Sequence, residues 1–461
     1  MRAILEAMAR SVSLGVGVIL TLALASVMAL ALWPIPDRPG LEMWIFSPEH
    51  QLLYEPALEQ RAADNRAHVN MRVIGIPSLK SRMMSAFFAG IPTADLIEIE
   101  RQMAGQAFTG PIEAVGFADL TELIAQEGLL EQINEPSFGP WTSRGRIFGL
   151  PHDVHPVLLG YRADIVEAAG IDVTQIETWD DFKRVLAPLM SDDNDDGDPD
   201  RYLLGMWFTD ADRLETVMLQ GGGRLFDEQG RVTMNTELNA RLLAEMITWF
   251  VGPDRIAADV PDFSAAGNQL KIEGYAIAYL MPDWMCNIWR LQMPQLEGKV
   301  KVMPMPAWEP GGRRTSVWGG TMLGIAKTTE RFDESWELAK DLYFSDAIAR
   351  ELYTRNDIVT PIKLYWDDPM FDEPDAYFSG QAKGRMYVDQ APLIPARTSS
   401  PYYKLAIDRL RDAAVAIAEW SRSTGTFDRN AIEARCKQEL ERAESLVRLQ
   451  MQRNVFLEAT P

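Results

Sequence analysis

The chain has 461 residues and a formal net charge of −21, and 47% of its residues are hydrophobic. This content is ample for large cores and argues against disorder, and the length predicts about two or three compact units. The acidic balance disfavours nucleic-acid binding, because it cannot neutralise a phosphate backbone. The only cysteines, Cys286 and Cys436, exclude a disulfide framework, and two separate buried thiols are favoured over a pair.

The N-terminus carries an export signal. Arg2 and Arg10 precede an uncharged run from Ser11 to Trp33. Positive charge before an apolar run keeps the N-terminus in the cytoplasm and exports the chain beyond the run. The run is long for a signal peptide and reaches the length of about 20 residues that spans a bilayer, so a cleaved signal and a retained membrane anchor are both open. Residues 1–39 are therefore interpreted as signal or anchor plus linker, and the rest as periplasmic or otherwise extracytoplasmic.

Strands and helices alternate from residue 41 onward. The sequence predicts strands at 41–47, 69–77 and 94–100, with helices at about 51–65 and 78–90. This alternation is typical of parallel βαβ units and predicts an α/β fold. In such sheets, ligands bind beyond the carboxyl ends of the strands. The candidate ligand residues here are Glu49 and His50, for which a solvated loop is the alternative, and Glu100 and Arg101.

The rest of the chain is richer in helices. Strands are predicted at 275–281, 299–306 and 321–328, and the clearest helices lie at 402–420 and 428–454. No GxSxG, HExxH or Walker motif occurs, and no GxGxxG follows a strand. The motifs therefore give little support to an enzyme.

A carboxylate-rich loop runs from Asp192 to Tyr202. Its acidic residues alternate around Gly197, as in calcium-binding loops, but Leu203 holds the place of the bidentate Glu that an EF-hand needs. A structural clip that binds calcium weakly and an Asx-rich solvated turn are both open. The candidate calcium ligands are Asp192, Asn194, Asp196, Asp198 and Asp200, and no other cofactor is predicted.

Several segments, taken in order, resemble one family. They include "SAFFAGIPTADLIEIE", "GLPHDVHPVLLGYRADIVEAAGI", "EGYAIAYLMPDWM" and "LIPARTSSPYYKLAI", and with others they run from about residue 41 to 420. Their order and spacing, with the export signal, resemble extracellular solute-binding proteins of family 1, the carbohydrate-type, maltose-binding-protein-like components of ABC importers. The resemblance implies a periplasmic-binding-protein type II fold, in which two α/β lobes joined by a hinge enclose a ligand cleft.

The resemblance also divides the chain. It implies that the chain crosses between lobes at 153–157, near 301–306 and near 355–361. One lobe then combines 40–153 with 304–356, and the other combines 154–303 with 357–461, which ends in a helical C-terminus.

The implied function is that of a monomer that binds a sugar or oligosaccharide and delivers it to the permease subunits of an ABC transporter. Three alternatives stay open. They are a binding protein for another solute (glycerol phosphate, a polyol, a peptide or a polyamine), a membrane-tethered sensor subunit, and a secreted carbohydrate-active enzyme.

A sugar site needs flat aromatic platforms and polar groups for the hydroxyl rim. Trp284 matches the family's stacking position, with core packing as the alternative, and Asp283 is either a hydroxyl acceptor or a helix cap. His155 stands where the family has a ligand-contacting carboxylate, and the alternative is a hinge histidine. The remaining implied ligand residues are Trp318, Gly319 and Gly320, in a loop that also fits a plain turn, and Arg397 and Tyr402.

Overall fold

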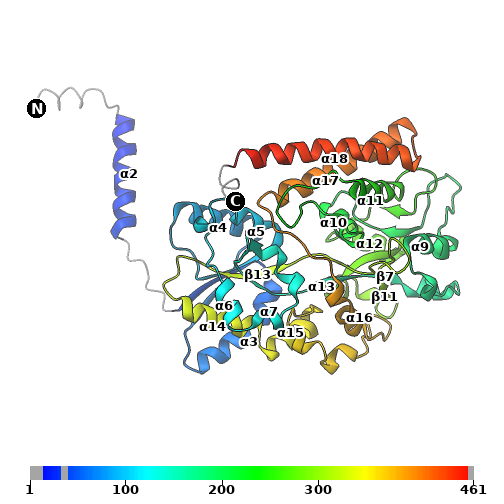
Figure 1. Cartoon of the computed structure of the whole chain (residues 1–461). Helices are drawn as coiled ribbons and strands as arrows, with labels where there is room; N and C mark the ends of the chain where they lie inside the picture. Colours follow the sequence, from blue (N-terminus) through cyan, green and yellow to red (C-terminus); the bar gives the residue numbers. More distant parts are fainter. Residues whose placement is uncertain (1–13, 33–39, 455–461) are drawn as a thin grey trace, which may run out of the picture. The chain divides into compact units, whose positions relative to one another are not determined.

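The computed structural model describes residues 14–32 and 40–454, which fall into two units (Figure 1). The unit Met1–Gly40 contains helix α2 (Leu14–Leu32), and the unit Leu41–Pro461 contains the sheets. The predicted positively charged start, within 1–13, and the linker at 33–39 lie outside the described residues. Within 14–32 and 40–454, no helix combines the length and apolarity of a membrane span.

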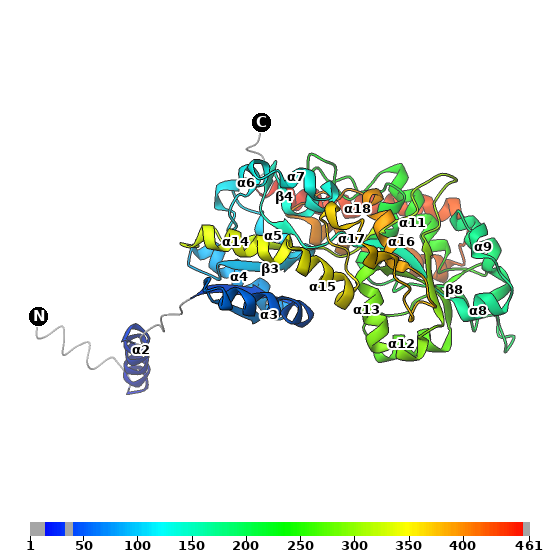
Figure 2. The same ribbon diagram turned by 90° about the horizontal axis from the view of Figure 1, so that it is seen from below.

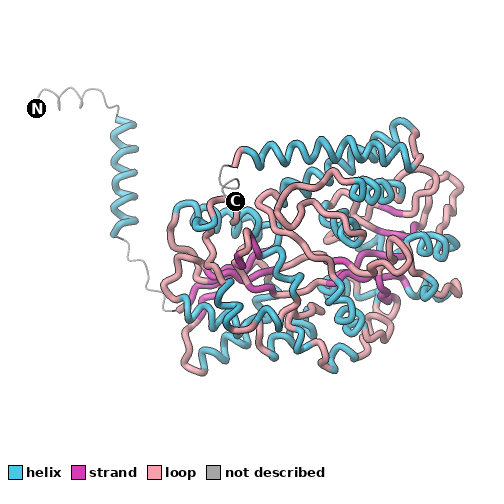
Figure 3. Tube along the Cα trace, viewed as in Figure 1, coloured by secondary structure: helices cyan, strands magenta, loops and turns pink. Residues whose placement is uncertain are grey.

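The first lobe is built on a five-stranded sheet (Figure 3, strands in magenta). In sheet order its strands are β2 (Val69–Val73), β1 (Leu41–Ile45), β3 (Leu96–Glu100), β13 (Thr321–Ile325) and β6 (Leu150–Pro151). β1 runs parallel to β2 and β3, whereas β13 runs antiparallel to β3 and β6. Apolar clusters that include Met43 and Ile97 form its two cores, as expected for a sheet covered on both faces.

Helices surround this sheet, and local sequence signals set their ends. Ser47 caps α3 by accepting a hydrogen bond from the backbone N–H of His50, and Pro48 takes the first helical position. α4 ends at Gly90 in the left-handed conformation. The helices of this lobe are α3 (Pro48–Ala63), α4 (Ile76–Ala89), α5 (Arg101–Ala107), α6 (Thr121–Gln126), α7 (Leu129–Gln132), α14 (Phe332–Tyr343) and α15 (Asp346–Asn356).

The second lobe has a six-stranded sheet whose strands β7 (Pro156–Arg162) and β10 (Ala276–Pro282) are both fully buried. Its strands are β11 (Val300–Pro304), β7, β10, β8 (Tyr202–Gly205) and β9 (Ala257–Ala258) in sheet order, with β12 (Ser316–Val317) also paired to β7. All seven residues of β7 are buried, because strands flank it on both sides and helices cover the sheet. A separate two-stranded pair joins β4 (Thr142–Ser143) and β5 (Arg146–Ile147).

The helices of the second lobe cover its sheet, as Figure 2 shows from below. They are α8 (Ala163–Ala168), α9 (Trp179–Leu186), α10 (Ala211–Gln220), α11 (Glu237–Thr248), α12 (Ala265–Glu273), α13 (Asp283–Gln292), α16 (Lys383–Gln390), α17 (Tyr403–Thr424) and α18 (Arg429–Gln452). α17 and α18 pack on each other and on α11. Cys286 and Cys436 are both free and buried, which confirms the prediction of two separate thiols.

The predicted two-lobed α/β fold is confirmed, but one predicted crossing is wrong. The chain leaves the first sheet after β6 and joins the second at β7. β11 pairs with β7 along its whole length, so 301–306 belongs to the second lobe, and the chain returns only between β12 and β13. An apolar strand bounded by prolines resembles a crossing segment, and only its nonlocal pairing identifies its sheet.

Candidate functional site

A cleft between the two lobes encloses about 1730 Å³, including space open to solvent. The first lobe contributes residues at the carboxyl ends of β1 and β3, where the α/β topology predicts ligands to bind. The second lobe contributes the N-terminal part of α10, one side of α13 along most of its length and the loop before α12. The crossing segments contribute His155, 318–321, Asn356 and Ile358.

Aromatic rings form one wall of this cleft. The Nε1–H of Trp284 donates to the backbone oxygen of Trp318 at 3.0 Å, and the two rings meet edge to face. Phe263 lies nearly parallel to Trp284, with ring centroids 6.1 Å apart and an interplanar angle of 13°. Its side chain is 53% exposed and its backbone is left-handed, with φ 56°. Such a site offers a flat apolar face to a ligand.

Arg213 is buried behind this wall. Its guanidinium lies 4.1 Å from the ring centroid of Trp318 and forms ion pairs with Asp210 at 2.7 Å and Asp262 at 2.6 Å. The charge of this arginine is therefore largely satisfied by protein groups, and the residue supports the aromatic wall.

Carboxylates from opposite lobes meet at one end of the cleft. Gln102 bridges them, because its backbone N–H donates to Glu100 at 2.9 Å and its side-chain amide donates to Asp212 at 2.8 Å. Burial, reinforced by the charge of Asp212 and opposed by Arg101, raises the pKa of Glu100 to about 7. Burial also raises the pKa of Asp212. These groups accept hydrogen bonds and give the cleft an acidic end.

Four of the predicted ligand residues do not line the cleft. Arg101 donates to Glu215 at 2.5 Å, and Arg397 donates to the backbone oxygen of Gly319 at 2.5 Å. Burial, with the nearby charge of Arg101, lowers the pKa of Arg397 to about 9. Asp283 is fully buried, and Tyr402 lies half-buried directly before α17. Glu49, His50, Glu100, His155, Trp284, Trp318, Gly319 and Gly320 do line it.

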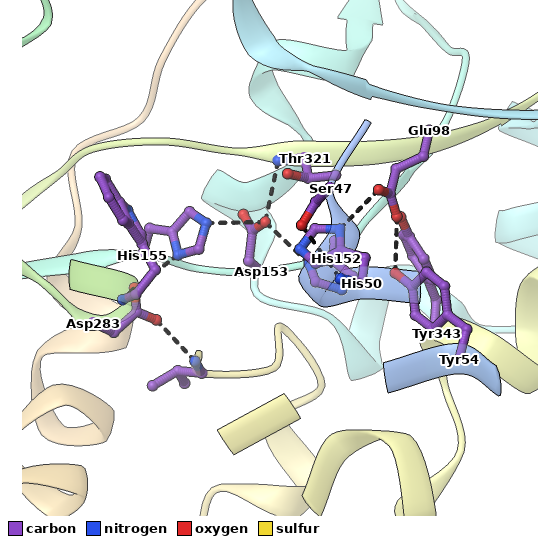
Figure 4. A network of polar contacts seen from close by, with 12 residues as sticks. Ser47, His50, Tyr54, Glu98, His152, Asp153, His155, Asp283, Thr321 and Tyr343 are labelled. Atoms are coloured by element: carbon purple, nitrogen blue, oxygen red, sulfur yellow. Dashed lines mark hydrogen bonds and ion pairs between the residues drawn. The ribbon is translucent and has the colours of Figure 1, made fainter. Parts of the chain in front are cut away.

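A chain of polar contacts runs from the first lobe through the crossing to the second (Figure 4). His50 contacts the buried Glu98 through Nδ1 at 2.7 Å. His155 contacts Asp153 through Nε2 at 3.0 Å and Asp283 through Nδ1 at 2.7 Å. Both ring nitrogens of His155 are thus occupied by protein carboxylates, so this residue offers a ligand only its ring surface.

Several lining residues are not predicted by the sequence, including Phe46, Asp210, Asp212, Arg213, Phe263, Asn287 and Asn356. Gln102 also lines the cleft, and it belongs to the loop after the third predicted strand, where the topology predicts ligand residues. Phe263 carries no such signal, because an aromatic residue before a helix resembles a core residue in sequence. Its exposure depends on the left-handed turn that precedes α12.

The acidic loop closes on its own backbone. Asp192 accepts hydrogen bonds from the N–H groups of Asp196 and Gly197, and Asp198 pairs with Arg255. Asn194, Asp196 and Asp200 likewise accept from backbone N–H groups of the loop. In the described part of the chain, no three His, Cys, Asp or Glu side chains converge as metal ligands. These capping contacts agree with the Asx-rich turn, and the weak calcium clip at the five residues stays a prediction.

Comparisons with known proteins agree with this architecture. The family model for bacterial extracellular solute-binding proteins matches residues 54–347. An arabinooligosaccharide-binding protein of Halalkalibacterium halodurans is 25% identical, covering 75% of this chain and 76% of the relative. A protein of the same name from Bacillus subtilis is 24% identical, over 65% of this chain and 67% of the relative.

Solved structures match the fold over most of both chains. The sugar-binding protein MalE from Xanthomonas citri has a TM-score of 0.71 at 18% identity, covering 89% of this chain and 99% of the other. A cyclo/maltodextrin-binding protein solved with maltotetraose has a TM-score of 0.68 at 16% identity, covering 91% and 99%. Since the family model matches well over half of its length, the chain belongs to the bacterial extracellular solute-binding proteins.

Proposed function

We propose that this protein is the substrate-binding component of an ABC importer and holds a sugar or oligosaccharide in the interlobe cleft. The observation that carries the proposal is a single cleft that combines the near-parallel rings of Trp284 and Phe263 with carboxylates and amides from both lobes. Aromatic rings stack on the apolar faces of sugars, and carboxylates and amides bind the hydroxyl groups. The names of the two arabinooligosaccharide-binding relatives support the same ligand class.

In this proposal some polar residues bind the ligand directly, and others hold the wall of the cleft in place. Glu49, Glu100 and Asp212 accept hydrogen bonds from ligand hydroxyls, and Gln102 and Asn287 supply amide donors. Asp283, Arg101 and Arg397 act behind the surface, where each is already bonded to protein groups.

The lobes act as rigid bodies around the crossings. We take the first lobe as 41–151 with 321–356 and the second as 156–317 with the remainder, so that the hinge lies in the three short connections. A ligand that touches both lobes only when they are closed shifts the population towards the closed form. The closed monomer then delivers its ligand to the permease subunits.

Membership of an extracellular family places the working protein outside the cytoplasm. The N-terminal apolar segment is proposed as the export signal. Mass spectrometry of the protein recovered from the extracytoplasmic fraction measures the mature N-terminus. A fragment that starts after residue 20 supports a cleaved signal, and an intact Met1 supports a retained anchor.

A cationic solute such as a polyamine is the second candidate, and the acidic end of the cleft favours it. Two carboxylates, Glu100 and Asp212, line this end, and Arg101, which pairs with Asp212 at 3.7 Å, also bonds to Glu215. The one arginine of the described cleft lining, Arg213, is paired with Asp210 and Asp262. The same imbalance disfavours glycerol phosphate and other anions.

A thermal-shift screen with neutral oligosaccharides, polyamines and sugar phosphates tests these proposals, because a ligand of the folded state raises Tm. A rise with arabinooligosaccharides or maltooligosaccharides alone supports the main proposal, and a rise with polyamines alone replaces it. The binding ligand is then incubated for long times with the protein. Its recovery intact agrees with a transport role, whereas hydrolysis contradicts it.

A further inference from the structure

His155 occupies a point where all three crossings meet. Its carboxylate partner Asp153 lies in the first crossing and accepts the backbone N–H of Thr321, the residue that directly follows the second crossing, at 3.1 Å. Its other partner, Asp283, accepts the backbone N–H of Val359, in the third, at 2.8 Å. The imidazole of His155 is therefore the group that joins the two carboxylates and, through them, the crossings (Figure 4).

Trp284, the aromatic platform of the cleft, is hydrogen-bonded to the same residues. Asp283 also accepts the backbone N–H of Trp284 at 2.8 Å. The backbone oxygen of His155 accepts from the N–H of Trp318, whose own oxygen holds the indole N–H of Trp284. A Cβ atom on Gly319 would lie 2.8 Å from the ring of His155, so the ring and this loop are fitted closely.

The geometry requires a charged ring. An ionised carboxylate only accepts hydrogen bonds, and a neutral imidazole has one N–H donor, so two carboxylate partners call for both nitrogens to donate. Burial alone lowers the pKa of His155, but the charges of Asp153 and Asp283 outweigh it and raise the pKa to about 10. Two further titratable groups lie nearby: His152, which shares Asp153 and whose pKa burial lowers, and Arg397, which donates to Gly319.

We propose that His155 is a positioning residue: as an imidazolium between Asp153 and Asp283, it holds the three crossings and Trp284 in one arrangement. The backbone of His155 is itself left-handed, with φ 56°, a cost that its surroundings must offset. The inference rests on the proposed function only in taking the cleft as the ligand site, and its test needs no ligand. A ligand screen without a hit therefore does not contradict the inference about His155.

The first experiment is NMR spectroscopy of the full-length protein labelled with ¹⁵N-histidine. Both ring nitrogens of His155, assigned by their loss in His155→Gln, are expected to stay protonated from pH 6 to about 8.5, well above the ordinary pKa of histidine. The exposed His68 gives a second histidine signal in the same spectra for comparison. A ring of His155 that is neutral at pH 7.5 overturns the proposal.

The second experiment is hydrogen exchange of the backbone amides of Trp284, Thr321 and Val359. In His155→Gln at pH 7.5 their protection is expected to fall at least about tenfold, because 1.4 kcal/mol of lost stabilisation already corresponds to that factor. The loss should shrink at pH 5.5, because Asp153 and Asp283, left without a cation, take up protons. His68→Gln is the matched control and should change none of the three.

A second substitution that restores the lost protection distinguishes the charge of His155 from its packing. Adding Asp283→Asn to His155→Gln removes one uncompensated buried charge, while the introduced amide keeps an oxygen for a backbone N–H. The double variant should regain part of the lost protection at pH 7.5 and lose most of its pH dependence. A pH-independent loss in the single variant, with no gain in the double variant, contradicts the proposal.

Discussion

Phe263 stacks on Trp284 with an interplanar angle of 13°, although 53% of its side chain remains exposed. The position also carries a left-handed backbone, which a bulky residue rarely adopts. A large apolar side chain kept exposed at such a position indicates a ligand-contacting role rather than a packing one.

Phe263→Ala should therefore weaken sugar binding while leaving folding almost unchanged. The loss of one aromatic face is expected to cost about 0.5–1.5 kcal/mol of binding free energy. Calorimetry with the sugar identified by the thermal-shift screen measures this, and urea titration measures stability. Phe263→Tyr keeps the ring and is the matched control. Equal affinity in the alanine and tyrosine variants would remove Phe263 from the site.

Trp284→Ala should lower both affinity and stability, in contrast to Phe263→Ala. The indole is half-buried and packs against the cores of both lobes, so its removal leaves a cavity as well as an empty platform. We expect about 1–3 kcal/mol of lost binding free energy and about 2–4 kcal/mol of lost stability. Unchanged affinity with a large stability loss would make Trp284 a core residue only.

Glu100→Gln should stabilise the protein at neutral pH. The pKa of Glu100 is raised from 4.5 to about 7, so between these values the unfolded chain is ionised while the folded one still binds the proton. The wild-type chain therefore loses stability as pH rises from about 4.5 to 7, and keeps that deficit above it. Urea titration should give the variant an advantage of about 1–2 kcal/mol at pH 7.5 and none at pH 4. A pH-independent difference would contradict the assignment.

His155 should make the protein sensitive to alkali. Its folded pKa is raised from 6.5 to about 10, so its contribution to stability is complete below 6.5 and is lost as pH rises through about 10. His155→Gln should cost about 3–5 kcal/mol of unfolding free energy at pH 6.5, as for a buried ion pair with one partner removed. The gap between variant and wild type should close by pH 10.5, and a constant gap would argue against a titrating His155.

The acidic loop should hold its shape without a metal ion. Asp192→Ala removes acceptors of two backbone N–H groups and should lower Tm slightly, whereas a chelator should leave the Tm of the wild type unchanged. Differential scanning calorimetry with and without EDTA measures both effects. A rise of Tm with added calcium that is lost in Asp192→Ala would support the calcium clip instead.

The elements of the first lobe could be predicted from the sequence because their signals are local. The strand expected at 94–100 is β3 (Leu96–Glu100), and the helix expected at 78–90 is α4 (Ile76–Ala89). The sheet to which β11 belongs could not be predicted, because strand pairing depends on residues far away in the chain. An apolar strand fits either sheet by composition alone.

The residues of the site also fall into those that local sequence signals predict and those that depend on distant contacts. Residues that follow a predicted strand, such as Glu100, could be identified because the topology places strand ends together. The partner of His155 in α13 is 128 residues away, so its double carboxylate contact is not visible in the sequence. Asp283 supports the aromatic wall from behind the surface, rather than facing a ligand as its place in the sequence suggests.

The position of β13 between β3 and β6 determines the order in which the two sheets can be completed during synthesis. The ribosome delivers β6 well before β13, and β3 and β6 have no direct pairing to join them. A nascent chain that ends at residue 320 already contains every strand of the second sheet that the structure describes. The sheet of the lobe that begins the chain is therefore the last to close, after every strand of the other sheet has been made.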